Sequence, residues 1–302
     1  MQSKISIVVL NWNGYRDTIE CIESLKKVTY PNYEVVLVDN GSTDGSEEIL
    51  REKFPDVPFI QTGENLGFAG GNNIGIRHAL SNGADYVILL NNDTVVDKEF
   101  VTAMVRVAEA DKSIGILTSK IYFYDRPDTI WYAGAIFNLK TGRSRHIGYN
   151  KKDKGQYNKV RETDRACGCL MMVSRKVCET VGLMNPEYFC YGEEVDWSLR
   201  VKNAGYRVVF VPNSKVWHKI SGSTGGAGKG FYLYYSVRNH LRLINTYLPF
   251  KSKVMSIVRD MLVIGRHLFS IFTVGVNKGY GIKNLWFGVR DYYHGRFGKR
   301  EL

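Results

Sequence analysis

Acidic side chains stand directly after two apolar runs of this chain. The segment Leu89-Leu90-Asn91-Asn92-Asp93 ends on a carboxylate, and Val38-Asp39-Asn40-Gly41 is built in the same way. Hard cations such as Mg²⁺ and Mn²⁺ prefer oxygen ligands and keep substrate phosphates in their coordination shell. A cation held at Asp93 could therefore neutralise a leaving diphosphate as a Lewis acid. The alternative role for Asp93 is that of a turn or helix-capping residue.

Two segments could surround the rest of a nucleotide. A carboxylate at Asp39 could accept the N3 hydrogen of a pyrimidine base, although an Asx turn is the alternative role. The segment Gly67–Asn73 contains Gly70 and Asn72, and glycines let a backbone approach a ligand because they have no Cβ. The segment has neither the Gly-Lys-Ser/Thr of a phosphate-binding loop nor the spacing of the dinucleotide fingerprint.

A cluster of acids and one histidine are further candidates. Glu193, Glu194 and Asp196 place three carboxylates in four positions. Clustering like charges costs stability, and this cost suggests that the acids have a function. One of them could be the general base that takes a proton from an attacking hydroxyl. The alternative is a solvated helix start, where acids are favourable. His218 follows an apolar run, and a lone histidine is more often a hydrogen-bonded structural residue.

The elements that position these residues alternate along the chain. Apolar runs predict strands at 5–10, 34–38, 57–61 and 86–90, and the segments between them carry apolar residues at helical spacing. This order predicts an α/β fold with a mostly parallel central sheet flanked by helices. Ligands of such sheets bind at the carboxyl ends of the strands. We therefore expect Asn11, Asp39 and Asp93 to converge on one crevice.

The remainder of the chain divides at about residue 222. We expect a strand at 169–174, a helix at 193–202 and a strand at 208–211, with no linker in the first 220 residues. Residues 1–222 would form the nucleotide-binding catalytic domain and 223–302 a basic helical extension. From residue 220 onward there are 13 of the 41 Lys and Arg but 3 of the 30 Asp and Glu, so the net charge of +11 is concentrated there.

The extension has two alternative roles. Residues 254–274 have the pattern of an amphipathic helix, which could pack on the first domain or lie in the interface of an anionic membrane. The aromatic and basic segment 286–300 suits headgroup depth. The five cysteines have no C-x-x-C pair, and no charged-then-apolar leader precedes the first strand. We expect reduced thiols and a cytoplasmic protein, which the membrane alternative would place on the cytoplasmic face of the cell membrane.

Taken in order, these segments resemble the inverting glycosyltransferases of family 2 with the A-type fold. The resemblance covers about residues 5–222. Within the family it is strongest to the rhamnosyltransferase-like branch, through Asn-Leu-Gly-Phe-Ala-Gly-Gly-Asn-Asn at 65–73 and Leu-Asn-Asn-Asp-Thr at 90–94. The resemblance implies a nucleotide-diphosphate sugar as donor, dTDP-rhamnose or a UDP-sugar. It also implies a glycan or lipid-linked acceptor, in the assembly of cell-surface polysaccharide or another glycan.

The resemblance also implies roles in donor binding. Asp39 would bind the base, and Asn65 with the glycine-rich turn would flank the nucleoside. Asp93 would bind Mg²⁺ or Mn²⁺ as the last acid of the family's Asp-x-Asp motif, with His218 as a second metal ligand. The crevice would also include Asn11, Asn91 and Asn92.

The catalytic base of the family is the second acid of a Glu-Asp-x-Asp motif. The resemblance assigns this role to Glu194, with Asp196 as a supporting group and Glu193 as a reserve candidate. The chain departs from the family in three places. Asn91 replaces the first acid of Asp-x-Asp, Asn72 stands where many relatives have an arginine facing the diphosphate, and Glu194 replaces Asp.

Three other functions compete with this one. A non-catalytic nucleotide-sugar sensor would share the crevice but would not need the acid cluster. A nucleic-acid-binding protein is suggested by the net charge, yet the chain has no recognised nucleic-acid motif and its charge avoids the nucleotide-binding part. A nucleotidyltransferase would need a glycine-rich signature with a basic residue near the first strand, which Asn11 to Gly14 do not provide.

Overall fold

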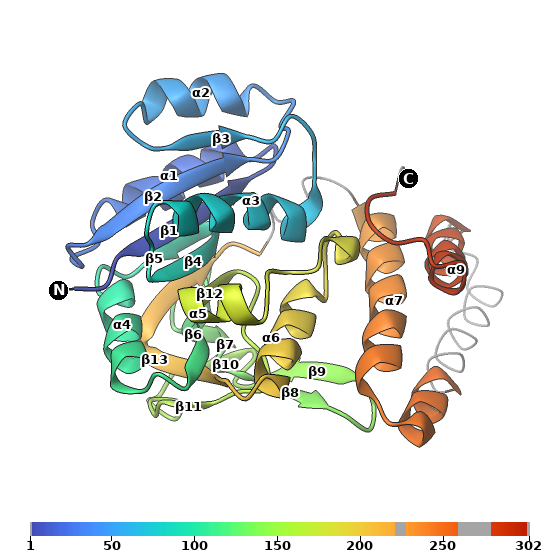
Figure 1. Ribbon diagram of the computed structural model, residues 1–302. Helices are drawn as coiled ribbons and strands as arrows, with labels where there is room; N and C mark the ends of the chain where they lie inside the picture. Colours follow the sequence, from blue (N-terminus) through green and yellow to red (C-terminus); the bar gives the residue numbers. More distant parts are fainter. Residues whose placement is uncertain (1, 221–227, 259–278, 301–302) are drawn as a thin grey trace.

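The computed structural model describes residues 2–220, 228–258 and 279–300 (Figure 1). Within these residues, one mixed sheet has the main strand order β10-β7-β6-β12-β4-β1-β2-β3, and β8 and β9 form a separate hairpin. The strands are β1 (Ile5–Asn11), β2 (Tyr33–Asp39), β3 (Phe59–Gln61), β4 (Tyr86–Asn91), β5 (Thr94–Val96), β6 (Ile114–Phe123), β7 (Thr129–Tyr132), β8 (Ala135–Asn138), β9 (Arg143–His146), β10 (Lys151–Lys152), β11 (Arg161–Glu162), β12 (Leu170–Ser174) and β13 (Arg207–His218). The α/β fold is confirmed.

Helices cover both faces of this sheet (Figure 1). Those nearest the sheet are α1 (Tyr15–Leu25), α2 (Ser46–Lys53), α3 (Gly67–Ser81), α4 (Phe100–Ala110), α5 (Arg175–Thr180) and α6 (Glu193–Asn203), with a short 3-10 turn η1 (Pro186–Tyr188). Helices α7 (Gly228–Tyr247) and α9 (Gly279–Tyr293) stand to one side of the sheet (Figure 1). The apolar run of β1 supplies both cores, because alternate side chains of a strand point to opposite faces. Ile5 and Ile7 pack with α1 and α4, while Val8 packs with α3. Burying each such side chain contributes roughly 1.5 to 3 kcal/mol.

The predicted parallel order holds for the half of the sheet formed by β3, β2, β1 and β4. Their carboxyl ends lie at one edge, because Asn11 pairs with Asp39 and Leu10 pairs with Asn91 across the neighbouring strands. Polar residues far apart in the sequence are thereby brought side by side, as the strand–helix alternation predicts.

The other half of the sheet is mixed. β12 runs antiparallel to both β4 and β6, and its first residue, Leu170, pairs with Leu90 near the end of β4. The loop before β12 therefore lies at the same edge as the carboxyl end of β4. β13 is antiparallel to β5, and His218 at its end pairs with Thr94. The residue after Asp93 is thus the sheet partner of His218.

β13 also pairs with β6, and the register between them shifts between Val211 and Lys215. The shifted segment contains Pro212, which has no backbone N–H to donate to a neighbouring strand. Proline within a sheet is typical of edges and bulges. The bulge lets one strand follow β6 along most of its length and still end beside β5.

The C-terminal helix α7 packs against the first domain, and α9 packs against α7 (Figure 1). The amide of Asn239 donates to the backbone oxygens of Tyr188, Cys190 and Tyr191, at 2.7 to 2.9 Å. Arg238 is fully buried and donates to the backbone oxygens of residues 187, 188 and 298. These bonds fix the backbone of the segment that leads into α6.

The predicted amphipathic helix at 254–274 lies mostly outside the described residues. Residues 250–258 are helical, and Ser256 donates a hydrogen bond to the backbone oxygen of Thr141 at 2.9 Å. The apolar side chains of Phe250 and Met255 are exposed. Among the helices that the structure describes, none combines the length and apolar character needed to cross a bilayer.

Candidate functional site

A cavity of about 540 Å³ opens at the edge of the sheet where the parallel strands end. Its lining includes six of the residues predicted for the site, namely Asn65, Asn91, Asn92, Glu193, Glu194 and His218. The lining residues are spread along the chain from Leu10 on β1 to Tyr232 on α7. The other six predicted residues do not line the cavity: Asn11, Asp39, Gly70, Asn72, Asp93 and Asp196.

Asp39 and Asn11 form a buried pair beneath the cavity. Asn11 donates from Nδ2 to Asp39 Oδ2 at 2.6 Å, while Asp39 Oδ1 accepts from the backbone N–H of Ser42 and from Gln61 Nε2. Asp39 has no exposed surface. The backbone N–H of Ser42 lies three residues after Asp39, one residue further than in an Asx turn, so this bond is a different local side-chain-to-backbone contact. Binding of a base by Asp39 stays a prediction.

The glycine-rich segment forms the first turns of α3. Asn65 Oδ1 accepts from the backbone N–H of Gly67, which has φ +74° and lines the cavity. Further along, a Cβ on Gly75 would lie 2.3 Å from Val8 Cγ1, and a Cβ on Gly70 would lie 2.8 Å from Leu66 Cβ. These glycines therefore serve helix packing, whereas Gly67 stands at the cavity itself.

Asn72 and Asn92 each bond to nearby protein groups. Asn72 is buried and donates to the backbone oxygen of Phe68 at 2.9 Å, one turn earlier in α3. Asn92 donates to Thr18 Oγ1 at 2.9 Å, which links the β4 terminus to α1. Asn92 lines the cavity but Asn72 does not, so a direct contact of Asn72 with a diphosphate stays a prediction.

Asp93 and His218 meet behind one wall of the cavity. His218 Nε2 lies 3.0 Å from Asp93 Oδ1, although the two atoms do not have hydrogen-bond geometry. Burial lowers the pKa of His218, but the Asp93 carboxylate outweighs burial and raises it overall. Both oxygens of Asp93 and both ring nitrogens of His218 are buried without a hydrogen-bond partner.

Buried carboxylate and imidazole atoms without partners fit a divalent cation, because both groups are metal ligands. Among the described residues, no group of three or more His, Cys, Asp or Glu is arranged to hold a metal ion. A cation at Asp93 and His218 would therefore take its remaining ligands from water and a bound diphosphate, as Mg²⁺ commonly does.

The three acids of α6 lie in different surroundings. Glu194 lines the cavity, its Oε2 accepts from the backbone N–H of Gly192 at 3.1 Å, and its Oε1 lies 3.6 Å from Arg165 Nη1. Glu193 is 4% exposed, and its Oε2 has no partner. Burial, reinforced by the neighbouring acids Glu194 and Asp196, raises the pKa of Glu193 well above its usual range.

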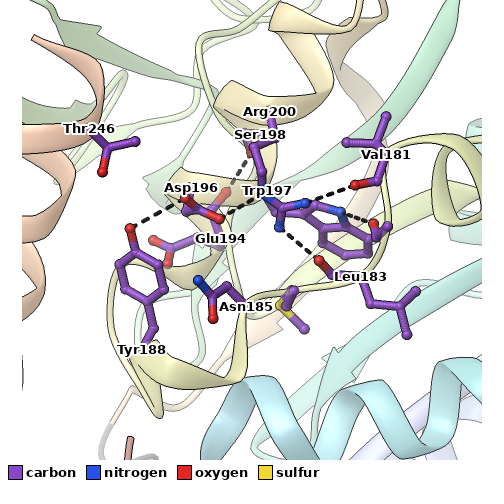
Figure 2. Close-up of polar contacts among 12 residues, drawn as sticks. Val181, Leu183, Asn185, Tyr188, Glu194, Asp196, Trp197, Ser198, Arg200 and Thr246 are labelled. Atoms are coloured by element: carbon purple, nitrogen blue, oxygen red, sulfur yellow. Dashed lines mark hydrogen bonds and ion pairs between the residues drawn. The ribbon is translucent and has the colours of Figure 1, made fainter. Parts of the chain in front are cut away.

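Asp196 points away from the cavity into a network of protein groups (Figure 2). It accepts from Arg200 Nε at 2.8 Å, from the Tyr188 hydroxyl at 3.4 Å and from the Tyr247 hydroxyl at 2.7 Å. Arg200 in turn donates to the backbone oxygens of Val181 and Leu183 (Figure 2). These bonds tie Asp196 to neighbouring protein groups, and its role as a supporting group of the catalytic base stays a prediction.

Sequence reasoning missed one wall of the cavity. Trp131 on β7, His146 on β9 and Arg165 in the loop before β12 all line it. The Trp131 ring centroid lies 4.7 Å from that of His146 and 5.0 Å from that of His218. The only signal in the sequence is that Arg165 shortly precedes a predicted strand, and its position follows only from the antiparallel direction of β12.

Comparison with known proteins agrees with this geometry. The family model described as glycosyl transferase family 2 matches residues 6–182. The chain is 28% identical over 288 residues to the dTDP-rhamnosyl transferase RfbF of Shigella flexneri, covering 92% of this chain and 91% of that protein. It is 26% identical over 212 residues to the low-salt glycan biosynthesis hexosyltransferase Agl10 of Haloferax volcanii, covering 69% of this chain but 64% of the relative.

The fold is also similar to a solved glycosyltransferase. A crystal structure of GalNAc-T7 with UDP, GalNAc and Mn²⁺ superposes with a TM-score of 0.65 at 18% identity, covering 81% of this chain and 48% of that one. The chain thus spans about half the length of that structure. Since the family model covers more than half of the chain, the chain belongs to glycosyl transferase family 2 and is an enzyme that transfers a sugar from a nucleotide-sugar donor.

Proposed function

We propose that this enzyme is an inverting transferase in which Glu194 is the catalytic base. The observation that carries the proposal is a single cavity with Glu194 on one wall and His218 on another, next to the buried Asp93 carboxylate, whose oxygens have no hydrogen-bond partner. Glu194 takes the proton of an acceptor hydroxyl, whose oxygen attacks the anomeric carbon from the face opposite the diphosphate. The bond from that carbon to the phosphate oxygen breaks, and its electron pair leaves with the nucleoside diphosphate.

The surroundings of Glu193 support the choice of Glu194 as base. Burial, reinforced by two neighbouring acids, raises the pKa of Glu193 well above its usual range and so favours its protonated form, which cannot accept a proton. Glu194 instead has partners suited to a carboxylate, the Gly192 N–H and the Arg165 guanidinium. Glu194 stands where the family motif has an aspartate, so its carboxylate lies one methylene further from the backbone.

Asp93 and His218 are the residues that would hold Mg²⁺ or Mn²⁺. When bound, the cation would neutralise charge that develops on the leaving diphosphate. Asn91 adds an uncharged oxygen and nitrogen at the same edge in place of a second acid. Asn65 and Gly67 would flank the nucleoside, with Asp39 and Asn11 behind them.

The donor we propose is dTDP-rhamnose, with UDP-sugars as the alternative, and the acceptor is a glycan or a lipid-linked saccharide. The similarity to RfbF along nearly the full length of both chains supports the rhamnose donor. A thermal-shift panel of dTDP- and UDP-sugars with Mg²⁺ or Mn²⁺ identifies the donor, because ligand binding raises the melting temperature. NMR of the product then reports the anomeric configuration. Retention of configuration, or a chain that binds no sugar nucleotide, contradicts the proposal.

We further propose that residues 223–302 attach the enzyme to the cytoplasmic face of the cell membrane, where a lipid-linked acceptor would be found. The side chains of Phe250 and Met255 are 79% and 67% exposed, and Lys251 and Lys253 lie between them in the sequence. Each cation near an anionic leaflet contributes about 1 kcal/mol.

The test compares the full chain with the double variant Phe250→Asp, Met255→Asp in co-sedimentation with vesicles containing phosphatidylglycerol. We expect the double variant to lose at least tenfold in partitioning, because two apolar side chains no longer enter the interface. Val160→Asp is the matched control at another exposed apolar position. Equal partitioning of all three proteins would reject membrane attachment through this helix.

A further inference from the structure

The wall between His218 and Glu194 is lined by Trp131, His146 and Arg165. Arg165 is nearly buried, and its Nε donates to Ser144 Oγ at 2.6 Å, two residues before His146 on β9. The Trp131 ring lies edge-on between the rings of His146 and His218. The three side chains thus lie between the candidate metal ligand His218 and the Arg165–Glu194 contact.

Each of these three side chains keeps one polar atom without a protein partner. His146 Nδ1 lies 3.1 Å from the backbone oxygen of Trp131, which can only accept, so Nδ1 carries the hydrogen. Burial, then the charge of Arg165, lowers the pKa of His146 to about 4. The ring is thus neutral at neutral pH, and its Nε2 is a hydrogen-bond acceptor.

The indole Nε1–H of Trp131 and the Nη2 group of Arg165 are donors for which no partner is found among the described residues. The buried side-chain atoms without a hydrogen-bond partner do not include these two donors or His146 Nε2. Since all three lack a partner, they must be in contact with solvent. Two donors and one acceptor on one wall match the hydroxyl groups of a sugar, which both donate and accept hydrogen bonds. The lone pair of His146 Nε2 would repel the carboxylate of a uronic acid.

We propose that Trp131, His146 and Arg165 form the hydroxyl-binding wall that holds the transferred sugar, a neutral hexose or deoxyhexose, between His218 and Glu194. The inference rests on the proposed function, because it assumes a sugar nucleotide in this cavity. His146 Nε2 accepts from one sugar hydroxyl, while Trp131 and Arg165 donate to others. The wall contacts the sugar and leaves the nucleoside diphosphate to the residues of β1, β2 and α3.

The test measures binding of a nucleoside diphosphate and of its sugar conjugate separately, by calorimetry with Mn²⁺ present. The probes are dTDP with dTDP-rhamnose, and UDP with UDP-glucose. His146→Phe keeps a ring against Trp131 but removes the acceptor. We expect its Kd for the sugar nucleotide to rise about tenfold and its Kd for the diphosphate to stay within about twofold. His146→Gln restores an acceptor oxygen and is expected to bind the sugar nucleotide within about threefold of the wild type.

His78→Phe is the matched control, since His78 lies near the end of α3 beside Asn82 and outside the cavity lining. Trp131→Phe removes the indole donor and gives a second route to the same result if His146→Phe does not fold. If His146→Phe weakens the binding of both ligands equally, or changes the Kd of neither, the proposed hydroxyl-binding wall is overturned. A wild-type chain that binds neither ligand instead overturns the proposed function.

Discussion

The Tyr247 hydroxyl donates a hydrogen bond of 2.7 Å to Asp196 Oδ1, which joins α7 to the helix that carries Glu194. Asp196 also pairs with Arg200 on its own helix. Its carboxylate therefore joins α6 to Tyr247, which lies 51 residues further along the chain. The C-terminal extension is thereby attached to the helix of the proposed base.

Replacing Tyr247 with Phe should destabilise the protein, because Asp196 loses a donor inside a half-buried network. Hydrogen bonds to charged groups contribute roughly 1.5 to 3 kcal/mol, so we expect a loss of that order in the free energy of unfolding. Urea denaturation measures it. Tyr293→Phe is the control, because Tyr293 is 61% exposed. Equal stability of Tyr247→Phe and the wild type would show that the bond contributes nothing.

Glu194→Gln and Glu193→Gln should differ sharply in turnover although they are neighbouring, isosteric changes. General-base catalysis contributes about 10²- to 10⁴-fold, so Glu194→Gln should lose that factor in kcat while still binding the donor. Glu193→Gln replaces a carboxyl group whose raised pKa favours the neutral form, and this variant should retain most of its activity. Release of nucleoside diphosphate in the presence of acceptor is the measurement. The reverse ranking would transfer the role of base to Glu193.

The stability of the wild type should fall with rising pH relative to Glu193→Gln. The pKa of Glu193 is raised in the folded state, so above its ordinary value of 4.5 the folded chain holds a proton that the unfolded chain has lost. The stability that this proton supplies is fully present below pH 4.5 and declines as pH approaches the raised pKa. The slope is at most about 1.4 kcal/mol per pH unit.

Denaturant unfolding of both proteins at several pH values between 5 and 8 gives this difference directly, since the contributions of other groups cancel. A difference that stays constant with pH would mean that Glu193 titrates alike in the folded and unfolded chains.

Asp93→Asn should remove the metal dependence of donor binding and destabilise the metal-free protein. Asp93 Oδ1 lies 3.0 Å from His218 Nε2 and raises the pKa of His218, so neutralising the carboxylate leaves the buried imidazole without its countercharge. We expect nucleotide-sugar Kd values with Mn²⁺ and with EDTA to differ in the wild type and to coincide in the variant. Differential scanning calorimetry checks the stability. A variant that still responds to Mn²⁺ would place the cation elsewhere.

The sequence predicts well the part of the site that depends on parallel strands. Asn11, Asp39 and Asn91 follow apolar runs that alternate with helices, and this alternation alone places their strands side by side with a common direction. The register then brings the three residues to one edge. Local patterns were sufficient because each step is a short strand–helix–strand connection.

The Trp131, His146 and Arg165 wall could not be predicted in the same way. Its position depends on the antiparallel direction of β12 and on the β8–β9 hairpin, and an apolar run carries no information about strand direction. The glycines of α3 show a related ambiguity. Gly75 and Gly67 look alike in the sequence, yet the first makes room for Val8 and the second borders the cavity.

The register shift between Val211 and Lys215 has a consequence for how this chain tolerates insertions and deletions. Side chains of a strand alternate between the two faces, so loss of one residue from the shifted segment would turn every later side chain of β13 to the opposite face. His218 would then point away from Asp93. Insertion or deletion of two residues at this position should therefore be tolerated. A change of one residue should leave a folded protein in which the imidazole of His218 no longer contacts Asp93.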